Sequence, residues 1–422
     1  MYQVPRGTSD ILPTEQLYWR FIEQKVVHIC QLYGYERIDT PVFEDTGLFT
    51  RGVGEGTDIV EKEMYTFEDR GGNKLTLLPE GTAPVCRAYL EHGLHNLPQP
   101  VKLYYFVSAF RYERPQAGRY RQHHQFGCEA IGESDPALDA EVIDMAWHFF
   151  QSLGLNRLTL LINSIGCKQC RPKYLAILKD YYGKYAQNLC ADCKVRLERN
   201  PLRLLDCKQP SCQQVADVAP RNIDYLCPSC DEHFKRLQKY LDLLGFPFQI
   251  NPRLVRGLDY YTRTVFEIQP EEEGSQSTIV GGGRYDDLIE ELGGKPTPAV
   301  GFATGIERIV RNLKREGIAV PLLPKPHVFL AFVGDEAGAE AMKLAAKLRR
   351  AGIGVIEAMG SRSLKAQLRQ ADALGARYTL IVGEQELKSH SVILRDMTTA
   401  QQKTVSLHQI ENELRDQITS RE

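Results

Sequence analysis

The sequence contains no apolar run long enough to cross a lipid bilayer, and its opening residues, MYQVPRGTSD, lack the apolar core of a secretory signal peptide. It also lacks an excess of charge of either sign, because 52 Lys and Arg stand against 54 Asp and Glu, for a formal net charge of −2. This balance excludes a uniformly basic nucleic-acid coat, so any polyanion must be met by a local patch. These absences predict a cytoplasmic protein that makes no membrane contact.

At 422 residues the chain is longer than one ordinary domain, and we expect two large domains with a small insertion. Pro321, Pro324 and Pro326 mark a linker. Beyond it the strand-like runs HVFLAFVG, IGVIEAM and RYTLIVG alternate with helical patterns, which predicts a small α/β domain with a parallel sheet. This domain is locally basic, and its cations suit either phosphate contact or ordinary solvated helix faces: Lys343, Lys347, Arg349, Arg350, Arg362, Lys365, Arg369 and Arg377.

The cysteines are concentrated in one segment of the chain. Most of them form C-x-x-C pairs, with two more between these pairs: Cys167 and Cys170, Cys190 and Cys193, Cys207 and Cys212, Cys227 and Cys230. In the cytoplasm such cysteines favour thiols or metal ligands over disulfides, and the C-x-x-C turn suits a tetrahedral zinc ion. Two zinc sites, or one site with spare thiols, fit this spacing. A helical insertion that merely buries cysteines as small apolar groups fits it too.

The stretch 101–132 predicts a β-hairpin. VKLYYFVSAFRYE alternates with a period of two, a turn follows at Pro115 to Gly118, and RYRQHHQFGCEAIG reads as the return strand. One face of the hairpin gathers charged and amide side chains, namely Arg111, Glu113, Arg121, Gln125 and Glu129. A charged ligand would explain this face, because burying such groups unpaired is costly. A solvated, salt-bridged sheet face is the alternative.

A second candidate site lies at the turn in TLLPEGTAP, where Glu80, Gly81 and Thr82 follow a predicted strand. A carboxylate and a hydroxyl there can recognise a ring nitrogen or an amine, but Glu80 and Thr82 can equally cap the helix that follows. The glycine-rich RGVGEGTD lacks the Gly-Lys-Ser/Thr ending of a phosphate-binding loop.

Polar residues also interrupt the apolar pattern of residues 248–310. LVRGLDYYTRTVFE brings Arg256, Tyr260 and Tyr261 together in one segment. We expect the glycine run in STIVGGGRYDDL to lie between a strand and a helix, where missing side chains would let a ligand approach the backbone. GFATGIERIV reads as a strand-end turn into a helix that carries Glu307 and Arg308.

Together, FRYERPQAGRYRQHHQFGCE, TLLPEGTAP, LVRGLDYYTRTVFE, GGGRYDDL and GFATGIERIV resemble the class II aminoacyl-tRNA synthetases, specifically the bacterial histidyl-tRNA synthetases. The resemblance runs essentially end to end. It implies an α+β multidomain protein that activates L-histidine with ATP and passes it to the 3′ end of tRNA(His). It also implies Mg²⁺ with ATP, no organic cofactor, and a homodimer formed through the Pro41 region.

The resemblance implies four segments. The catalytic core, an antiparallel sheet flanked by helices, comprises residues 1–166 and 236–320, and the cysteine-rich helical insertion comprises residues 167–235. Residues 321–422 are the linker and an α/β anticodon-binding domain. The family does not imply a metal in the insertion.

Site roles carry over residue by residue. Arg256 and Arg111 are the implied catalytic residues. Histidine binding is implied for Glu80, Gly81, Thr82, Arg111, Gln125, Glu129, Arg256, Tyr260 and Tyr261. ATP binding is implied for Arg111, Glu113, Arg119 and Arg308, and contact with the tRNA acceptor end for Gln116 and Arg121.

The sequence departs from the family at two positions outside these sets. Leu78 stands where many relatives have arginine, and His123 where many have phenylalanine. The main alternative is a catalytically inactive, synthetase-like regulatory subunit of histidine biosynthesis. Such proteins typically lack the anticodon domain and have lost motif residues, whereas Arg111, Arg256 and Arg308 are all present here.

Overall fold

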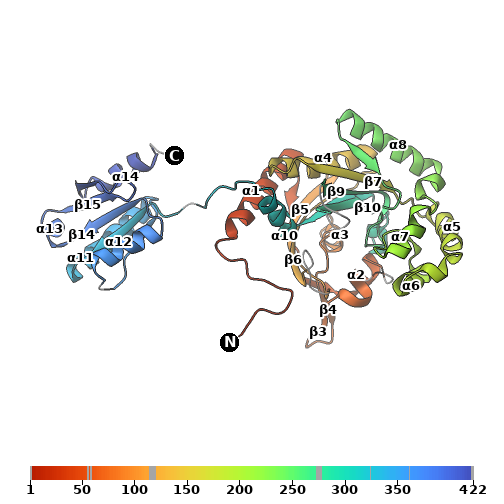
Figure 1. The fold of residues 1–422 in the computed structure, drawn as a ribbon, viewed down its shortest axis with the longest axis horizontal. Coiled ribbons are helices and arrows are strands. Elements are labelled where there is room, and N and C mark those ends of the chain that lie inside the picture. The colour runs from red at the N-terminus through yellow and green to blue at the C-terminus, as the bar shows by residue number, and fades with distance from the viewer. Residues whose placement is uncertain are drawn as a thin grey trace. The chain divides into compact units, whose positions relative to one another are not determined.

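The structure is a computed structural model that describes residues 2–54, 57, 59–113, 120–271, 278–323, 325–360 and 362–419. The chain divides into two compact units, Met1–Pro321 and Leu322–Glu422 (Figure 1). No helix in these described ranges is both long and apolar enough to cross a membrane.

The first unit is built on a sheet that has eight strands in the described ranges. In spatial order they are β1 (Glu36–Arg37), β5 (Val101–Phe110), β6 (Gln122–Ile131), β11 (Ala299–Gly305), β10 (Val280–Arg284), β9 (Thr262–Pro270), β7 (Leu158–Ser164) and β8 (Phe248–Ile250). All pairs from β5 to β7 are antiparallel, and only the edge pairs with β1 and β8 are parallel. The predicted antiparallel core is therefore confirmed.

The hairpin predicted for 101–132 is formed by β5 and β6. Val101 lies opposite Ile131 and Phe110 opposite Gln122, without a break in register. Phe126, Cys128 and Ala130 point into the main core, as the alternation predicts. The predicted turn at 115–118 lies outside the described residues.

Helices cover the core face of this sheet, and their sequences explain their limits. In α1 (Gln16–Tyr33) the buried Ile22, Val26 and Ile29 recur at helical spacing, and Gly34 ends the helix with a left-handed φ of 73°. The helix α4 (Pro136–Ser152) begins where Asp135 accepts a hydrogen bond from the Ala137 amide. The other helices of this core are α8 (Pro228–Leu243) and α10 (Ile306–Arg315).

The second face of the sheet is covered by short elements. A three-stranded sheet there has the order β2 (Phe43–Asp45), β4 (Lys74–Leu77), β3 (Thr66–Glu68) within the described residues, and β3 and β4 form a hairpin. With it lie α2 (Thr46–Gly52), the π-helical turn Ile59–Glu63, α3 (Thr82–Glu91), the 3-10 turn Leu94–Asn96 and α9 (Leu288–Glu291).

The cysteine-rich insertion is helical, as predicted. Its helices are α5 (Arg171–Gly183), α6 (Ala191–Arg199) and α7 (Pro210–Asp217), joined by 3-10 turns at Ala186–Asn188, Pro201–Leu204 and Asn222–Tyr225. Figure 1 shows these three helices grouped at one end of the first unit. The chain returns through α8, whose Phe234, Leu237 and Leu241 already belong to the main core.

One sequence expectation is wrong in detail. Gly281, Gly282 and Gly283 do not separate a strand from a helix, because they lie inside β10 with partners on both sides. A Cβ on Gly282 would come within 2.5 Å of the Gly301 carbonyl oxygen. Close approach of neighbouring protein groups therefore explains this glycine.

The second unit is a separate α/β fold. Its described strands have the order β13 (Val355–Glu357), β12 (Val328–Phe332), β14 (Tyr378–Val382), β15 (Ser391–Asp396), β16 (Gln402–Ser406), with α11 (Asp335–Arg350), α12 (Leu364–Ala373), α13 (Glu384–Lys388) and α14 (Ile410–Thr419). The pairs of β12 with β13 and β14 are parallel, as predicted. The antiparallel β15 and β16 were not anticipated.

Candidate active site

The predicted site residues meet in one cavity of about 430 Å³ on the second face of the large sheet. Of the predicted residues that the structure describes, all but Arg121 line it, namely Glu80, Gly81, Thr82, Arg111, Glu113, Gln125, Glu129, Arg256, Tyr260, Tyr261 and Arg308. Arg119 and Gln116 lie outside the described residues. The charged hairpin face is therefore the floor of a cavity and is not a solvated surface.

Glu80 both caps a helix and faces the cavity. Its carboxylate accepts hydrogen bonds from the Thr82 amide at 2.7 Å and the Ala83 amide at 2.8 Å, so it caps the N-terminus of α3. The same carboxylate accepts from the Tyr260 hydroxyl at 3.3 Å and lines the cavity while only 3% exposed. Helix capping thus fixes the orientation of a group that faces the cavity.

Glu129 is the centre of a buried hydroxyl network. It accepts from the Thr82 hydroxyl at 2.7 Å, the Tyr105 hydroxyl at 3.0 Å and the Tyr285 hydroxyl at 2.5 Å. Burial raises the pKa of Glu129 to about 8, against the lowering effect of these hydrogen bonds. Neighbouring Glu80 adds to the increase through charge repulsion. Glu129 can therefore change its protonation state close to neutral pH.

Three glycines make room for this network. A Cβ on Gly81 or on Gly127 would lie 2.2 or 2.3 Å from the Tyr105 ring, so the ring fits only between two residues without side chains. A Cβ on Gly301 would lie 1.9 Å from Glu129 Oε2. The positions of Tyr105 and Glu129 therefore depend on glycine at the start of α3 and on the strands β6 and β11.

The side of the cavity is formed by tyrosines that precede β9. Tyr260 and Tyr261 are 4% and 6% exposed, and their ring centroids lie 4.8 Å apart. Tyr285 approaches Tyr260 edge-on, with centroids 5.7 Å apart. These rings give an apolar wall beside the carboxylates of Glu80 and Glu129.

Arg256 lies over the glycine run. Its guanidinium pairs with Glu267 of β9, whose other carboxylate oxygen accepts from the Thr278 hydroxyl at 2.5 Å. A Cβ on Gly281 would lie 1.8 Å from Arg256 Nη2. The run that we expected to admit a ligand is thus occupied in part by this arginine.

Arg111 and Arg308 occupy the other end of the cavity. Arg111 Nε donates to the Pro79 carbonyl at 2.9 Å, and Arg308 Nη1 donates to the Thr278 carbonyl at 2.5 Å. Burial lowers the pKa of His123 to about 3, and both arginines add to this decrease through charge repulsion. His123 is therefore neutral between the two cations.

Gln125 carries a buried acceptor at the cavity. Its side-chain Oε1 is buried and has no hydrogen-bond partner among the residues that the structure describes. A buried acceptor of this kind is costly unless something donates to it. Because Gln125 lines the cavity, a ligand with an N–H group would satisfy it.

Arg121 has a different position. Its guanidinium carbon lies 4.1 Å from the centre of the Tyr112 ring, and its Nε donates to the Glu113 carbonyl at 3.3 Å. It stands at the start of β6, next to the undescribed hairpin tip.

Sequence reasoning missed several residues that line the cavity. Tyr105 shares the strand parity of Arg111 but reads as an apolar core residue, and Tyr285 follows the glycine run without a motif of its own. Arg196 and Arg203 come from the insertion. No local sequence signal could place them at a cavity formed mainly by the sheet.

The eight cysteines of the insertion form two clusters. Cys167, Cys170, Cys227 and Cys230 form the outer cluster, where the insertion leaves and rejoins the core, and Cys190, Cys193, Cys207 and Cys212 form the inner cluster. In each cluster the four sulfurs lie within 4.8 Å of one another, so each could hold one metal ion. All eight are free thiols. The first C-x-x-C pair therefore lies with the last, and the middle pair lies with Cys207 and Cys212.

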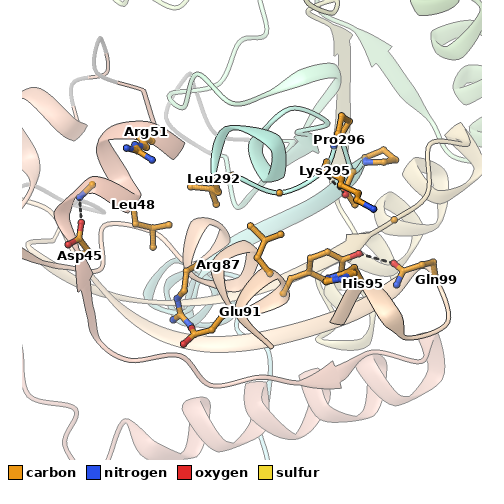
Figure 2. A pocket seen from close by; sticks show the side chains of 18 residues that line it. Asp45, Leu48, Arg51, Arg87, Glu91, His95, Gln99, Leu292, Lys295 and Pro296 are labelled. Atoms are coloured by element: carbon orange, nitrogen blue, oxygen red, sulfur yellow. Dashed lines mark hydrogen bonds and ion pairs between the residues drawn. The ribbon is translucent and has the colours of Figure 1, made fainter. Parts of the chain in front are cut away.

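A second cavity, of about 1190 Å³, contains none of the predicted residues (Figure 2). It is lined by α2, by α3 and by the segment 292–298, with Arg87 paired to Glu91 at 2.8 Å and the Tyr89 hydroxyl donating to Gln99 at 3.2 Å. Asp45, the last residue of the short strand β2, also lines it.

Two family models match the chain. The model described as histidyl-tRNA synthetase matches residues 7–169 and 213–309, and the one described as an anticodon binding domain matches residues 327–417. The segment between the two matched parts of the first model, 170–212, contains α5, α6 and the inner cluster up to its last cysteine.

Individual proteins resemble the chain over its whole length. A histidine–tRNA ligase of Dehalococcoides mccartyi is 63% identical over 418 residues, covering 99% of this chain and 100% of that protein. A histidine–tRNA ligase of Desulforamulus reducens is 53% identical over 406 residues, covering 96% and 97%. The crystal structure of apo histidyl-tRNA synthetase of S. aureus superposes with a TM-score of 0.82 at 40% identity, covering 98% of this chain and 99% of that one. With a family match over most of its length and full-length relatives at such identities, the chain belongs to the histidyl-tRNA synthetase family.

Proposed function

We propose that this protein is a histidine–tRNA ligase. It activates L-histidine with ATP, releasing pyrophosphate and forming histidyl-adenylate, and then transfers histidine to the 3′ end of tRNA(His). The observation that carries the proposal is the convergence of Arg111, Arg256 and Arg308 on the same cavity as the buried acids Glu80 and Glu129. Such a cavity can bind a cationic amine and a polyphosphate side by side.

Histidine fits the acidic end. Glu129 and the unsatisfied Gln125 oxygen would accept from the α-ammonium group, with Thr82 beside them. Glu80 and the Tyr260 hydroxyl would serve the imidazole, which offers one donor and one acceptor when neutral. Gly81 gives the pocket its width, and Tyr261 closes its side. An isostere that lacks the ring donor and the ring acceptor would leave buried partners unpaired.

ATP fits the basic end. Attack of the histidine carboxylate on the α-phosphorus develops negative charge, which Arg111 and Arg256 are placed to stabilise, while Arg308 would hold a phosphate and Glu113 the adenine. Arg119 is assigned to the γ-phosphate by resemblance only. Among the described residues the groups able to hold a metal are cysteines, so Mg²⁺ would enter with ATP as part of the substrate.

The tRNA would be held at two places. The second unit contains the match to an anticodon binding domain, and we propose that residues 321–422 serve as linker and anticodon reader. By resemblance, Gln116 and Arg121 would meet the acceptor end of the tRNA. The remaining divisions proposed are the core at 1–166 and 236–320 and the insertion at 167–235. We propose a cytoplasmic location, where its tRNA substrate is charged.

We further propose a homodimer. Val42 and Phe43, which follow Pro41, are 52% and 44% exposed, and Phe67 of β3, whose ring centroid lies 6.3 Å from that of Phe43, is 44% exposed. Exposed apolar side chains gathered in this way are typical of a protein interface. The cavity of Figure 2 continues from the same segment through Asp45 and Leu48. Sedimentation should give twice the mass of one chain, and Phe43→Glu should shift it toward one.

We also propose that each cysteine cluster binds one zinc ion. Zn–S bonds of about 2.3 Å place tetrahedral ligands about 3.8 Å apart. The sulfur separations are 3.9 Å for Cys167–Cys170, 3.8 Å for Cys167–Cys227 and 3.9 Å for Cys190–Cys207, far longer than the roughly 2 Å of a disulfide. Mass spectrometry of protein washed with a mild chelator should find two zinc ions per chain.

The test of the main proposal is histidine-dependent exchange of pyrophosphate into ATP. Folded protein with Mg²⁺ should catalyse this exchange and charge tRNA(His). Absence of both activities would favour the regulatory alternative. The retained arginines and the anticodon-domain match argue for catalysis.

A further inference from the structure

The segment Arg253–Tyr261 carries Arg256, Tyr260 and Tyr261 but has no helix or strand of its own. It runs between the end of β8 and the start of β9, and we call it the 253–261 loop. The first residues of the loop are bound to the core, because the Asn163 side chain donates to the Leu254 carbonyl at 2.9 Å. The core also binds the Asp259 amide through the Val53 carbonyl at 3.1 Å. A site residue on irregular backbone needs further support to be held accurately.

Residues 200–205, which lie between cysteines of the inner cluster, contact this loop at several points. Asn200, which directly follows α6, donates from Nδ2 to Asp259 Oδ1 at 2.7 Å. Arg253 Nε donates to the Leu205 carbonyl at 3.3 Å, and Arg203 Nη1 would lie 3.3 Å from a Cβ on Gly257. The residues 200–205 that make these contacts lie between Cys193 and Cys207, two members of the inner cluster.

Arg171, which is next to the outer cluster in the sequence, contacts the end of the loop. Arg171 directly follows Cys170 and donates to the Tyr261 carbonyl. The same guanidinium donates to the Gly166 carbonyl at 3.3 Å and the Ile165 carbonyl at 3.4 Å. One side chain thus joins the root of the insertion to the backbone of a residue in the cavity wall.

Residues 200–205 have little regular structure to keep them in place. They form a short 3-10 turn, Pro201–Leu204, at the end of the nine-residue helix α6. Helices of this length are marginal without tertiary support. A metal ion bound by Cys193 and Cys207 would fix both ends of the stretch that includes this turn.

From these contacts we infer that the insertion is a metal-dependent brace on the 253–261 loop, which places Arg256, Tyr260 and Tyr261 for histidine binding. This inference rests on the proposed zinc sites and on the proposed ligase function. Asn200 and Arg171 are positioning residues in it, because they act through Asp259 and Tyr261 on the groups that face the cavity.

The first test separates the brace from the metal. Asn200→Ala should retain two zinc ions per chain and its thermal unfolding midpoint, while the histidine Kd and the histidine KM rise about tenfold. The ATP KM should change less than about twofold. Glu198→Ala is the matched control, because Glu198 lies on α6, two residues before Asn200, and its carboxylate pairs with Lys179 on the surface at 3.7 Å. It should leave both constants unchanged.

A rescue experiment tests the route of the effect. The double variant Asn200→Asp with Asp259→Asn restores an amide–carboxylate hydrogen bond with the partners exchanged, and should recover most of the lost histidine affinity. If each substitution only damaged the local structure, the losses of histidine affinity in the two single variants would add in the double variant. Unchanged histidine affinity in Asn200→Ala, or additive losses in the exchange, would overturn the brace.

The second test removes the inner metal. Cys193→Ser with Cys207→Ser should reduce zinc to one ion per chain and raise the histidine Kd by at least as much as Asn200→Ala. A variant that loses this zinc and binds histidine normally would contradict the inference. If this variant does not fold, the histidine Kd of Asn200→Ala still tests the inference. Wild-type protein without histidine-dependent exchange would refute the ligase proposal, whereas histidine Kd still reports on the brace.

Discussion

The two ends of the cavity hold their charged side chains in different ways. At the acidic end, Glu80 and Glu129 are almost fully buried, and each already accepts several hydrogen bonds from the protein. At the basic end, Arg111 and Arg308 are anchored on neutral carbonyl oxygens. The acids are thus fixed in geometry, and burial raises the pKa of both, whereas each of these two cations donates to a neutral oxygen. The first arrangement suits selection of a small amine, and the second suits attraction of phosphate.

The strongest test of this contrast is at the junction of the two ends. Arg256→Ala should lower histidine-dependent pyrophosphate exchange by about a thousandfold, because it removes a guanidinium from the developing charge. Binding of tRNA, measured by filter retention, should stay within about twofold of wild type. An unchanged exchange rate would show that Arg256 has a different role.

The geometry of the acidic end can be broken without changing its charge. Gly301→Ala would place a Cβ 1.9 Å from Glu129 Oε2 and 2.4 Å from the Cys128 carbonyl oxygen. We expect histidine affinity to fall by about a hundredfold, since a strand or the carboxylate must move. Calorimetric titration with histidine measures this. Gly183→Ala, where a Cβ meets nothing within 4 Å, is the control and should bind normally.

The protonation of the acidic end predicts a pH dependence. With a pKa of about 8, Glu129 is protonated at pH 7 in the free protein, so binding an ammonium group should release a proton. Histidine affinity should rise about tenfold as the pH is raised from 7 to 8.5. Titrations in buffers of different ionisation enthalpy count the released proton, and Glu129→Gln should abolish the release.

The same shift affects stability with a definite sign. The pKa of Glu129 is raised above its unfolded value of 4.5, so the folded state binds the extra proton. The related stability is complete below pH 4.5 and is lost as the pH rises toward 8. Compared with wild type, Glu129→Gln should show a flatter decrease of the free energy of unfolding across this window in urea titrations.

The smallest effect is expected at the basic end. His123 is neutral between Arg111 and Arg308, so it adds no charge there. His123→Phe keeps a ring of similar breadth and should change the ATP KM by less than about threefold. A larger loss would mean that the imidazole hydrogen-bonds to the substrate.

The sequence identified those parts of the site that follow from strand alternation. Gln125 and Glu129 were placed on one face because side chains alternate across a strand, and β5 and β6 confirm this. Tyr105 has the same parity, but its hydroxyl partner Glu129 is 24 positions away, and alternation alone does not show such pairs. The role of Gly281 depended on where Arg256 lies, which only the fold determines.

The cysteine spacing predicted metal-ligand chemistry but not its partition. Which C-x-x-C pairs act together depends on how the helices of the insertion fold back, and the structure joins the first pair with the last. Contacts such as Asn200 with Asp259 join segments whose local patterns are unrelated. In the second unit, β15 runs antiparallel to β14 after the short helix α13, and a turn leads from β15 into β16, whereas the alternating helix pattern predicted only the parallel strands.

The outer cluster has a consequence for chain entropy. Cys170 and Cys230 are 60 positions apart, yet their sulfurs lie 3.9 Å from each other. Closing a flexible loop of that length costs roughly 4 kcal/mol, and a shared ion would compensate for this at the root of the insertion. The two ends of the insertion would then be held together at the core, whatever sequence lies between them. Insertions of different length and sequence could therefore be exchanged at this root without disturbing how the sheet folds.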